Sequence, residues 1–238
     1  MYSEQMDVTW DFCPRPFEGE SFLSWFTRLA KENCSDVDLL YRKLRLLSSS
    51  RPIEKQAIES QLMNLESNKK LKNKLIENLS PFVDINLPRL KESLFNISEI
   101  LKQWGFRSVL LQTPRYCPSC LKNDETPYFR YFWFLNFFTY CDVHKCILTE
   151  SCPHCSHPIK FWKTNWNQSI DTCFNCNGDL KQGMKMFLKV EPTFQEQVLK
   201  IFKTCISNGS NFFWQSWKIA LKESKIISLM SFLDTFGL

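Results

Sequence analysis

The chain has 238 residues, of which 44% are hydrophobic, and its formal net charge is +5. This length and apolar content predict a globular protein with one sizeable core or a few small modules. The mild positive charge does not by itself indicate a nucleic-acid-binding protein. The N-terminus has neither the basic nor the apolar segment of a signal peptide, so we expect a reducing cytoplasm, where paired thiolates bind metals.

The first 110 residues are expected to form a helical domain. Apolar residues recur every three or four positions from Ser21 onward, which predicts an amphipathic helix. Residues 33–35 break this pattern, and a second helix is expected with Ser35 as its N-cap. Two short helices joined by a tight turn resemble a helix-turn-helix unit. The apolar face of the second helix is expected to consist of Leu39, Leu40 and Leu44.

Basic residues end this second helix, and they are candidates for contacts with DNA or with a partner protein. The simpler interpretation is that they only stabilise the helix dipole. The candidates are Arg42, Lys43 and Arg45.

Further helices are expected from Pro52, with a break at residues 67–68 and a new start at Lys69 that ends before Pro81. The lysine-rich run at 69–74 could meet phosphate, but a solvated face explains it more simply. Shorter helical pieces are predicted at 88–95 and 97–104.

Four pairs of potential metal ligands follow within residues 111–181, and each pair has two residues between its members. Such a turn can aim two side chains at one ion, and two turns complete a tetrahedral zinc site. The sequence therefore predicts two structural zinc ions. The pairs are Cys117 with Cys120, Cys141 with His144, Cys152 with Cys155, and Cys173 with Cys176.

The order of the pairs favours sequential grouping, with three cysteines and a histidine in the first site and four cysteines in the second. The intervening segments, 121–140 and 156–172, each have the length of a short hairpin. An interleaved, cross-braced grouping stays open at this point. His154 and His157 could compete as ligands, although the four pairs already fill both sites. The unpaired cysteines are expected to be small buried apolar residues, namely Cys13, Cys34, Cys146 and Cys205.

Residues 128–140 form the most aromatic stretch of the chain. Such rings can stack on nucleic-acid bases, but a small zinc module also needs large rings to fill its core, and we favour that explanation. The stretch is too short to span a membrane. After the Asn177-Gly178 turn, residues 182–238 are expected to form a helical tail, with helices at 193–205 and 212–236.

The charge is unevenly distributed. Residues 28–74 carry eleven basic and six acidic side chains, whereas residues 115–180 carry six of each. The excess of positive charge therefore lies outside the metal-ligand region, which favours a protein-facing scaffold over a surface that follows phosphates.

Taken together, these motifs resemble the TniQ/TnsD family, the target-selection proteins of Tn7-like transposons, including those that are CRISPR-associated. The resemblance is carried by the N-terminal run at 16–30, with its Glu20-Ser21-x-x-Ser24-Trp25 segment, and by the run from Arg115 to Cys176 that holds all eight ligands. It implies a mainly α fold with small zinc-bound β elements. In order, these are a helix-turn-helix domain (1–110), tandem zinc-finger or zinc-ribbon modules (111–181) and a helical tail (182–238).

The resemblance also implies a function. Members of this family are non-catalytic prokaryotic adaptors that link a target-bound complex to the AAA+ ATPase regulator of a transposase. The chain resembles the short family type that a CRISPR effector delivers, so the target-bound partner is expected to be a CRISPR effector complex or target DNA. The resemblance allows a homodimer as well as a single copy. Nucleic-acid contacts are expected to be modest.

Two other classes of function were weighed. A zinc deaminase would need an open coordination position and a glutamate two residues after its histidine. Here Lys145 and Cys146 follow His144, so we expect no enzyme. A sequence-specific helix-turn-helix DNA-binding regulator is the alternative, and it would need a concentrated basic recognition helix.

Overall fold

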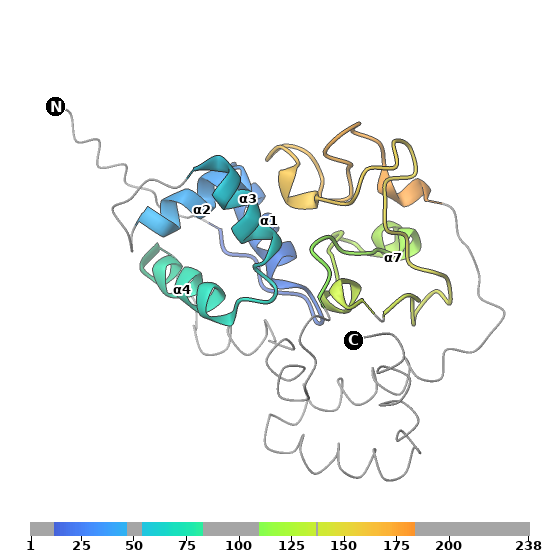
Figure 1. Cartoon of the computed structure of the whole chain (residues 1–238), viewed down its shortest axis with the longest axis horizontal. Coiled ribbons are helices and arrows are strands. Elements are labelled where there is room, and N and C mark those ends of the chain that lie inside the picture. Colours follow the sequence, from blue (N-terminus) through green and yellow to red (C-terminus); the bar gives the residue numbers. More distant parts are fainter. Residues whose placement is uncertain (1–11, 47–53, 83–109, 137, 184–238) are drawn as a thin grey trace, which may run out of the picture.

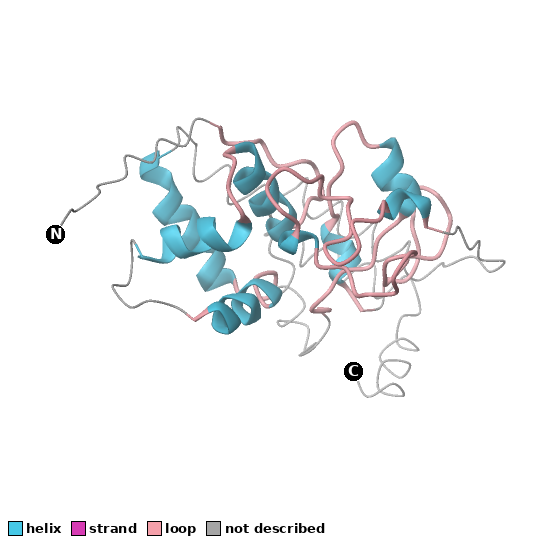
Figure 2. Cartoon of the chain, turned by 90° about the horizontal axis from the view of Figure 1, so that it is seen from above, coloured by secondary structure: helices cyan, strands magenta, loops and turns pink. Residues whose placement is uncertain are grey.

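Figure 1 shows the computed structural model of the chain, and the segments it describes are residues 12–46, 54–82, 110–136 and 138–183. Helices α1 to α4 gather on one side, and the region of the metal-ligand pairs lies beside them (Figures 1 and 2). Within these segments no helix is long and apolar enough to cross a membrane. The predicted helices outside them are those at 88–95, 97–104, 193–205 and 212–236.

Helix α1 spans Phe22–Glu32 and begins where the sequence predicts. The Ser21 side chain accepts a hydrogen bond from the Ser24 backbone N–H at 3.1 Å, which caps one of the free N–H groups at the helix start. The apolar side chains at three- and four-residue spacing are buried, as predicted. They are Phe22, Trp25, Phe26 and Leu29.

Helix α2 spans Val37–Leu46, one position later than a cap at Ser35 would require, so that prediction was wrong. The residue before the helix is Asp36, whose carboxylate accepts the Trp166 backbone N–H at 2.7 Å. Leu39 was wrongly placed on the apolar face and is 47% exposed. The face that packs on the other helices runs through Leu40 and Leu44, one turn apart, and Leu39 points away from it.

The turn between α1 and α2 contains a cysteine whose predicted burial was wrong. Cys34 lies in this turn with φ of 51° and is exposed, although the sequence predicted a buried side chain. The left-handed conformation lets the chain reverse within four residues and lifts the side chain toward solvent. A helix pair with a tight turn is therefore present, while its use as a DNA-binding helix-turn-helix unit stays a prediction.

Helices α3 (Lys55–Met63) and α4 (Lys69–Leu79) both pack on α2, and the short 3-10 helix η1 (Ser80–Phe82) follows α4. The predicted break between α3 and α4 is confirmed. Asn68 caps α4 by accepting the Leu71 backbone N–H at 3.0 Å.

One lysine of the 69–74 run is not solvated. Lys72 is 3% exposed, and its ammonium donates a hydrogen bond to the backbone carbonyl of Glu66 at 3.0 Å. The Glu66 carboxylate in turn accepts the Leu23 backbone N–H at 2.6 Å, at the start of α1. The prediction of a wholly solvated face was wrong at this position, because a buried carboxylate on the facing segment needs a cation nearby.

A buried ion pair joins the segment before α1 to the helix itself. The Arg28 guanidinium donates to both carboxylate oxygens of Glu20, at 2.9 and 2.7 Å. The Ser24 hydroxyl donates to the same carboxylate at 2.8 Å and accepts the Phe129 backbone N–H at 2.9 Å. These contacts connect α1 with the aromatic stretch, which lies more than a hundred residues later in the chain. An antiparallel bridge between Glu20 and Arg130 also pairs the segment before α1 with this stretch.

The metal-ligand region contains short elements only. They are helix α7 (Pro118–Asn123) and the 3-10 helices η2 (Tyr131–Phe134), η3 (Phe161–Lys163) and η4 (Leu180–Gln182). In the described segments the β structure consists of six isolated antiparallel bridges, so the predicted β elements are smaller than hairpins of regular strands.

The aromatic stretch fills the core, as predicted. Phe129 stacks on Phe161 with ring centroids 4.1 Å apart, which joins the first ligand region to the second. One continuous set of buried apolar residues extends from α1 to η4. The buried rings and leucine of the stretch are Phe129, Tyr131, Trp133, Phe134, Leu135, Phe138 and Tyr140.

Polar contacts hold the helices to the second ligand region. The Lys31 ammonium donates to the backbone carbonyls of Asn165 and Gln168 at 2.6 and 2.8 Å. Glu59 of α3 forms ion pairs with Lys160 and Lys163 at 2.9 and 2.7 Å. The helices thus support both ligand regions.

Replacing Arg28 with methionine is expected to lower the free energy of unfolding by about 3–5 kcal/mol, because it leaves the Glu20 carboxylate buried without its partner. Urea unfolding followed by circular dichroism measures this loss. The matched control is Arg42→Met, which removes an ion pair between the half-exposed side chains of Arg42 and Asp38 within α2 and should change stability by less than about 1 kcal/mol. Equal effects of the two variants would contradict the structural role of the buried pair.

Candidate metal centres

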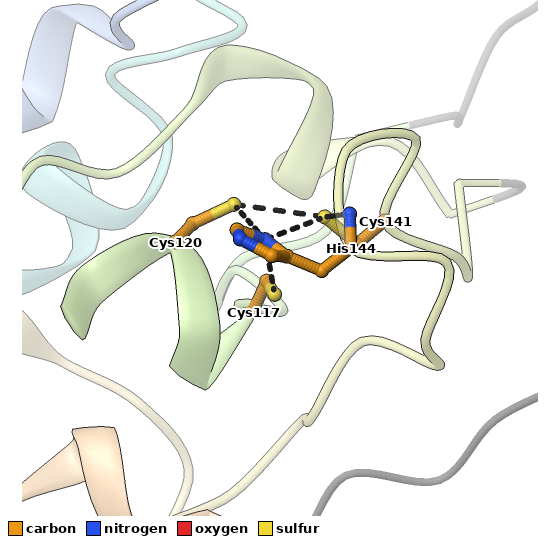
Figure 3. A group of neighbouring side chains, drawn as sticks. All are labelled: Cys117, Cys120, Cys141 and His144. Carbon is orange, nitrogen blue, oxygen red and sulfur yellow. Dashed lines mark hydrogen bonds between the residues drawn. The ribbon is translucent and has the colours of Figure 1, made fainter. Parts of the chain in front are cut away.

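The first cluster combines Cys117 and Cys120, at the start of α7, with Cys141 and His144 from a later turn (Figure 3). The His144 Nδ1 atom lies 3.5, 3.2 and 3.8 Å from the three sulfurs, and the sulfurs of Cys120 and Cys141 are 3.6 Å apart. All three cysteines are buried and the histidine is half-buried. The four donor atoms therefore converge on one point inside the molecule.

The second cluster combines Cys152, Cys155, Cys173 and Cys176. The sulfurs of Cys152 and Cys176 are 3.7 Å apart, as are those of Cys155 and Cys173. Cys176 is exposed, so this cluster lies nearer the surface than the first. In both clusters the donor atoms lie within 4.8 Å of one another, and the grouping is the sequential one.

These spacings fit a tetrahedral ion. Zinc–sulfur bonds of about 2.3 Å at tetrahedral angles place two sulfurs about 3.8 Å apart, and a sulfur and a nitrogen ligand about 3.5 Å apart. The observed separations of 3.6–3.7 Å between sulfurs and 3.2–3.8 Å to the histidine nitrogen agree with these values. Two clusters of soft thiolate donors are thus available to metal ions, and their composition is that of zinc sites.

Three of the four ligand turns share one backbone geometry. In the turns that begin at Cys141, Cys152 and Cys173, the N–H of the first cysteine donates to the carbonyl five residues later, at 2.8 to 2.9 Å. The N–H of the residue after the second ligand donates back to the first cysteine at 2.9 Å. Each turn is closed by an antiparallel bridge between the residues that flank it.

The residue after the second ligand has a left-handed conformation in all three turns, with φ between 51° and 59°. Sequence reasoning recognised only the last turn, from its Asn-Gly pair. In all three turns this residue directly follows the second ligand, and that shared position is the sequence signal that could have predicted the other two turns. These residues are Lys145, Ser156 and Asn177.

The first ligand turn is different, because it begins a helix. Pro118 follows Cys117 at the first position of α7, where its fixed φ is compatible with the helix and its missing N–H is not needed. Cys120 lies one turn along, and the Leu121 N–H donates to the Cys117 carbonyl at 3.2 Å. One ligand pair of the first cluster is therefore held by a helix and the other by a tight loop.

The surroundings shift the pKa values of the ligand thiols in different directions. The His157 backbone N–H lowers the pKa of the Cys155 thiol to about 6. Hydrogen bonds from Cys120 and Cys141 lower the pKa of the Cys117 thiol, whereas burial raises that of Cys152 to about 12. A bound divalent cation favours the thiolate at every sulfur, so such differences among ligands are overcome on binding.

Two further residues that the sequence did not single out adjoin the first cluster. The side-chain amide nitrogen of Asn123 lies 3.0 Å from Nε2 of His144, on the far side of the ring from the sulfurs. With Nδ1 as a metal ligand, Nε2 carries the proton, and the oxygen of the Asn123 amide is the group that can accept a hydrogen bond from it and orient the ring. Cys146 is buried as predicted, but its sulfur lies 3.6 Å from that of Cys117. No spacing rule marks either residue, because both contacts depend on the fold.

The competing histidines lie outside both clusters. His154 Nε2 is 3.1 Å from the Asp179 carbonyl, and His157 Nδ1 is 3.2 Å from the Cys155 carbonyl. Both are exposed. Gly178 packs so closely on the His154 ring that a Cβ there would lie 2.4 Å from it, which explains the glycine in this turn.

The basic candidates of α2 have different surroundings, and their contact with DNA or a partner stays a prediction. Arg42 pairs with Asp38 one turn earlier at 3.6 Å, and Lys43 is half-buried. Arg45, by contrast, lines an open hollow between α2 and α4.

Comparison with known proteins gives one result. A family model described as TniQ matches residues 12–148, which is more than half of the chain. The match includes α1 to α4 and the first metal cluster. No curated protein matches the chain.

Metal analysis tests the two clusters. We expect two zinc ions per chain in the purified protein, and one in each of the variants Cys120→Ser and Cys152→Ser, because a site that loses one of four ligands binds far more weakly. The control Cys34→Ser changes an exposed cysteine outside both clusters and should keep two ions. Elemental analysis gives the count, and thermal melting should show lower stability for both ligand variants. A Cys152→Ser protein with two ions and native melting would show that Cys152 is not a ligand.

Proposed function

The chain belongs to the TniQ family, and from this we propose that it is a non-catalytic adaptor that selects target sites in DNA transposition. In this role it links a target-bound complex to the AAA+ ATPase that regulates the transposase. Family membership supports the transposition-related role. We propose in addition that the AAA+ ATPase is its direct partner and that the target-bound partner is an RNA-guided CRISPR effector.

The observation that carries the adaptor role is the composition of the two metal clusters. Each supplies four protein ligands, which is the complement of a closed structural zinc site. A catalytic zinc keeps a position for water and places a general base beside it. The group at the far side of His144 is the Asn123 amide, which cannot act as a general base. When bound, zinc would therefore stabilise the fold and not activate a substrate.

The packing of the family's motif residues supports the same role. The Glu20–Arg28 pair and Ser24 hold α1 against the aromatic stretch, and Lys31 and Glu59 hold the helices against the second ligand region. An adaptor needs two surfaces at a defined distance, and a continuous core provides it.

The alternative is a sequence-specific DNA-binding regulator. It is favoured by the short turn between α1 and α2 and by the cations near the end of α2. The two functions predict different partners, so one pair of binding measurements separates them.

The adaptor should capture its ATPase. We expect the tagged chain to retain the AAA+ ATPase encoded at the same locus in a pull-down with ATP present, and Cys34→Ser to retain it equally. Cys152→Ser should reduce capture at least tenfold, since loss of a structural metal disorders its module. A CRISPR effector from the same locus, offered in a parallel pull-down, tests the second partner.

The outcome that contradicts the proposal is also defined. A protein with both zinc ions that fails to capture the ATPase, but prefers one DNA sequence over competitor DNA by about 10³-fold or more, is a regulator. Capture of the ATPase with little sequence preference supports the adaptor.

A further inference from the structure

Two basic segments of the sequence meet in one open hollow of about 430 Å³ between α2 and α4. Arg45 reaches it from the last turn of α2, and Lys70 and Lys74 reach it from α4. In Figure 1 these two helices lie near each other at the end of the helical part that is remote from the metal clusters. The remaining lining residues are Gln61, Asn68 and Leu71.

The fold divides the lysines of α4 between two environments. Lys72 turns inward to Glu66 and is buried. Lys70 and Lys74 are one turn apart on the exposed side, and both border the hollow. Like charges at this spacing repel each other on a helix, so an anion between them would be favourable.

Cations border the hollow without an acidic residue among its described lining residues. Among the described residues no aspartate or glutamate lines it, and neither Lys70 nor Lys74 forms an ion pair there. Several other cations in the described part of the chain do lie beside carboxylates. Such pairs are Arg42–Asp38, Arg115–Glu150, Arg130–Asp124, Lys163–Glu59 and Lys181–Asp171.

The polar groups of the lining are also compatible with an anion. The oxygen of the Gln61 side chain accepts the Tyr41 hydroxyl, and the oxygen of the Asn68 side chain accepts the Leu71 N–H. With both amide oxygens engaged inside the protein, the amide nitrogens are the groups left to donate. Three cations and two amides thus border one hollow.

We propose that this hollow binds backbone phosphates of a nucleic acid. Phosphate is the anion that suits clustered arginine and lysine side chains, and a nucleic-acid strand supplies phosphates in series to cations on neighbouring helices. Among the described lining residues none is aromatic, which favours contact with the backbone over contact with bases. Nucleic-acid binding at this hollow goes beyond the protein-bridging role proposed above.

The test is nucleic-acid binding by the full chain across a range of salt concentrations. Fluorescence anisotropy is measured with a mixed-sequence DNA duplex and, separately, with single-stranded RNA of one of its sequences. The variant is Lys70→Glu with Lys74→Glu. Its matched control is Lys122→Glu with Lys55→Glu, because both control residues are exposed lysines that lie outside the hollow.

The expected result is a loss of affinity of tenfold or more for the hollow variant at low salt, and less than threefold for the control. If each lysine neutralises one phosphate, the slope of log K against log salt on duplex DNA should become shallower by about 1.8, which is twice the value per phosphate. The probe that shows the larger loss, duplex or RNA, identifies the source of the phosphates. Circular dichroism checks folding, and Lys70→Gln with Lys74→Gln should give about half the loss.

Three results would overturn the inference. They are a native chain that binds neither probe, a hollow variant with native affinity and slope, and a control that loses as much as the hollow variant. Free inorganic phosphate that displaces the probes at concentrations equal to the probe phosphate would show a site for the free ion instead.

ATPase capture by the same variants separates this inference from the adaptor proposal. Capture with no nucleic-acid binding defeats this inference alone, and binding without capture defeats only the adaptor proposal.

Discussion

The buried carboxylate of Glu20 is the constraint on which the arrangement of this molecule depends. A carboxylate 3% exposed is strongly destabilising unless a cation and hydrogen bonds surround it, and Arg28 and Ser24 provide both. Because Ser24 also accepts the Phe129 N–H, α1 and the aromatic stretch are held in one register. The aromatic stretch in turn lies between the two turns of the first metal cluster. The Glu20-Ser21-x-x-Ser24-Trp25 segment, which carries part of the family resemblance, therefore forms the contacts that hold the helices next to this cluster.

The metal clusters add a second kind of order, which is local. Three turns reach the same geometry from three unrelated sequences, each with a left-handed residue after its second ligand. That conformation is costly for residues other than glycine, and bonds from four ligands to an ion are strong enough to maintain it. With an ion bound, the clusters would stabilise short irregular segments that lack the hydrogen-bond ladder of regular strands. Large rings such as Phe129 and Phe161 fill the space between these segments.

The cations show how tertiary structure changes the meaning of a charged run. Lys72 serves the interior by neutralising Glu66, while its neighbours Lys70 and Lys74 border the hollow with Arg45. A lysine-rich helix usually indicates only a solvated face. Here the lysines differ in their surroundings. Lys72 contacts Glu66 in the segment between α3 and α4, whereas Lys70 and Lys74 border the hollow together with Arg45 of α2.

The sequence by itself determined the features that depend on near neighbours. The spacing of the ligand pairs, the start of α1 at Ser21, the break before Lys69 and the family resemblance all rest on residues a few positions apart. Turn geometry, helix periodicity and capping act over that range. Only the tertiary structure decided that Leu39 and Cys34 are exposed, that Lys72 is buried, that Cys146 touches the first cluster, and that Arg45 meets α4. Each of these depends on which face of an element is covered by a segment distant in the chain. Local sequence patterns do not specify which distant segments pack together.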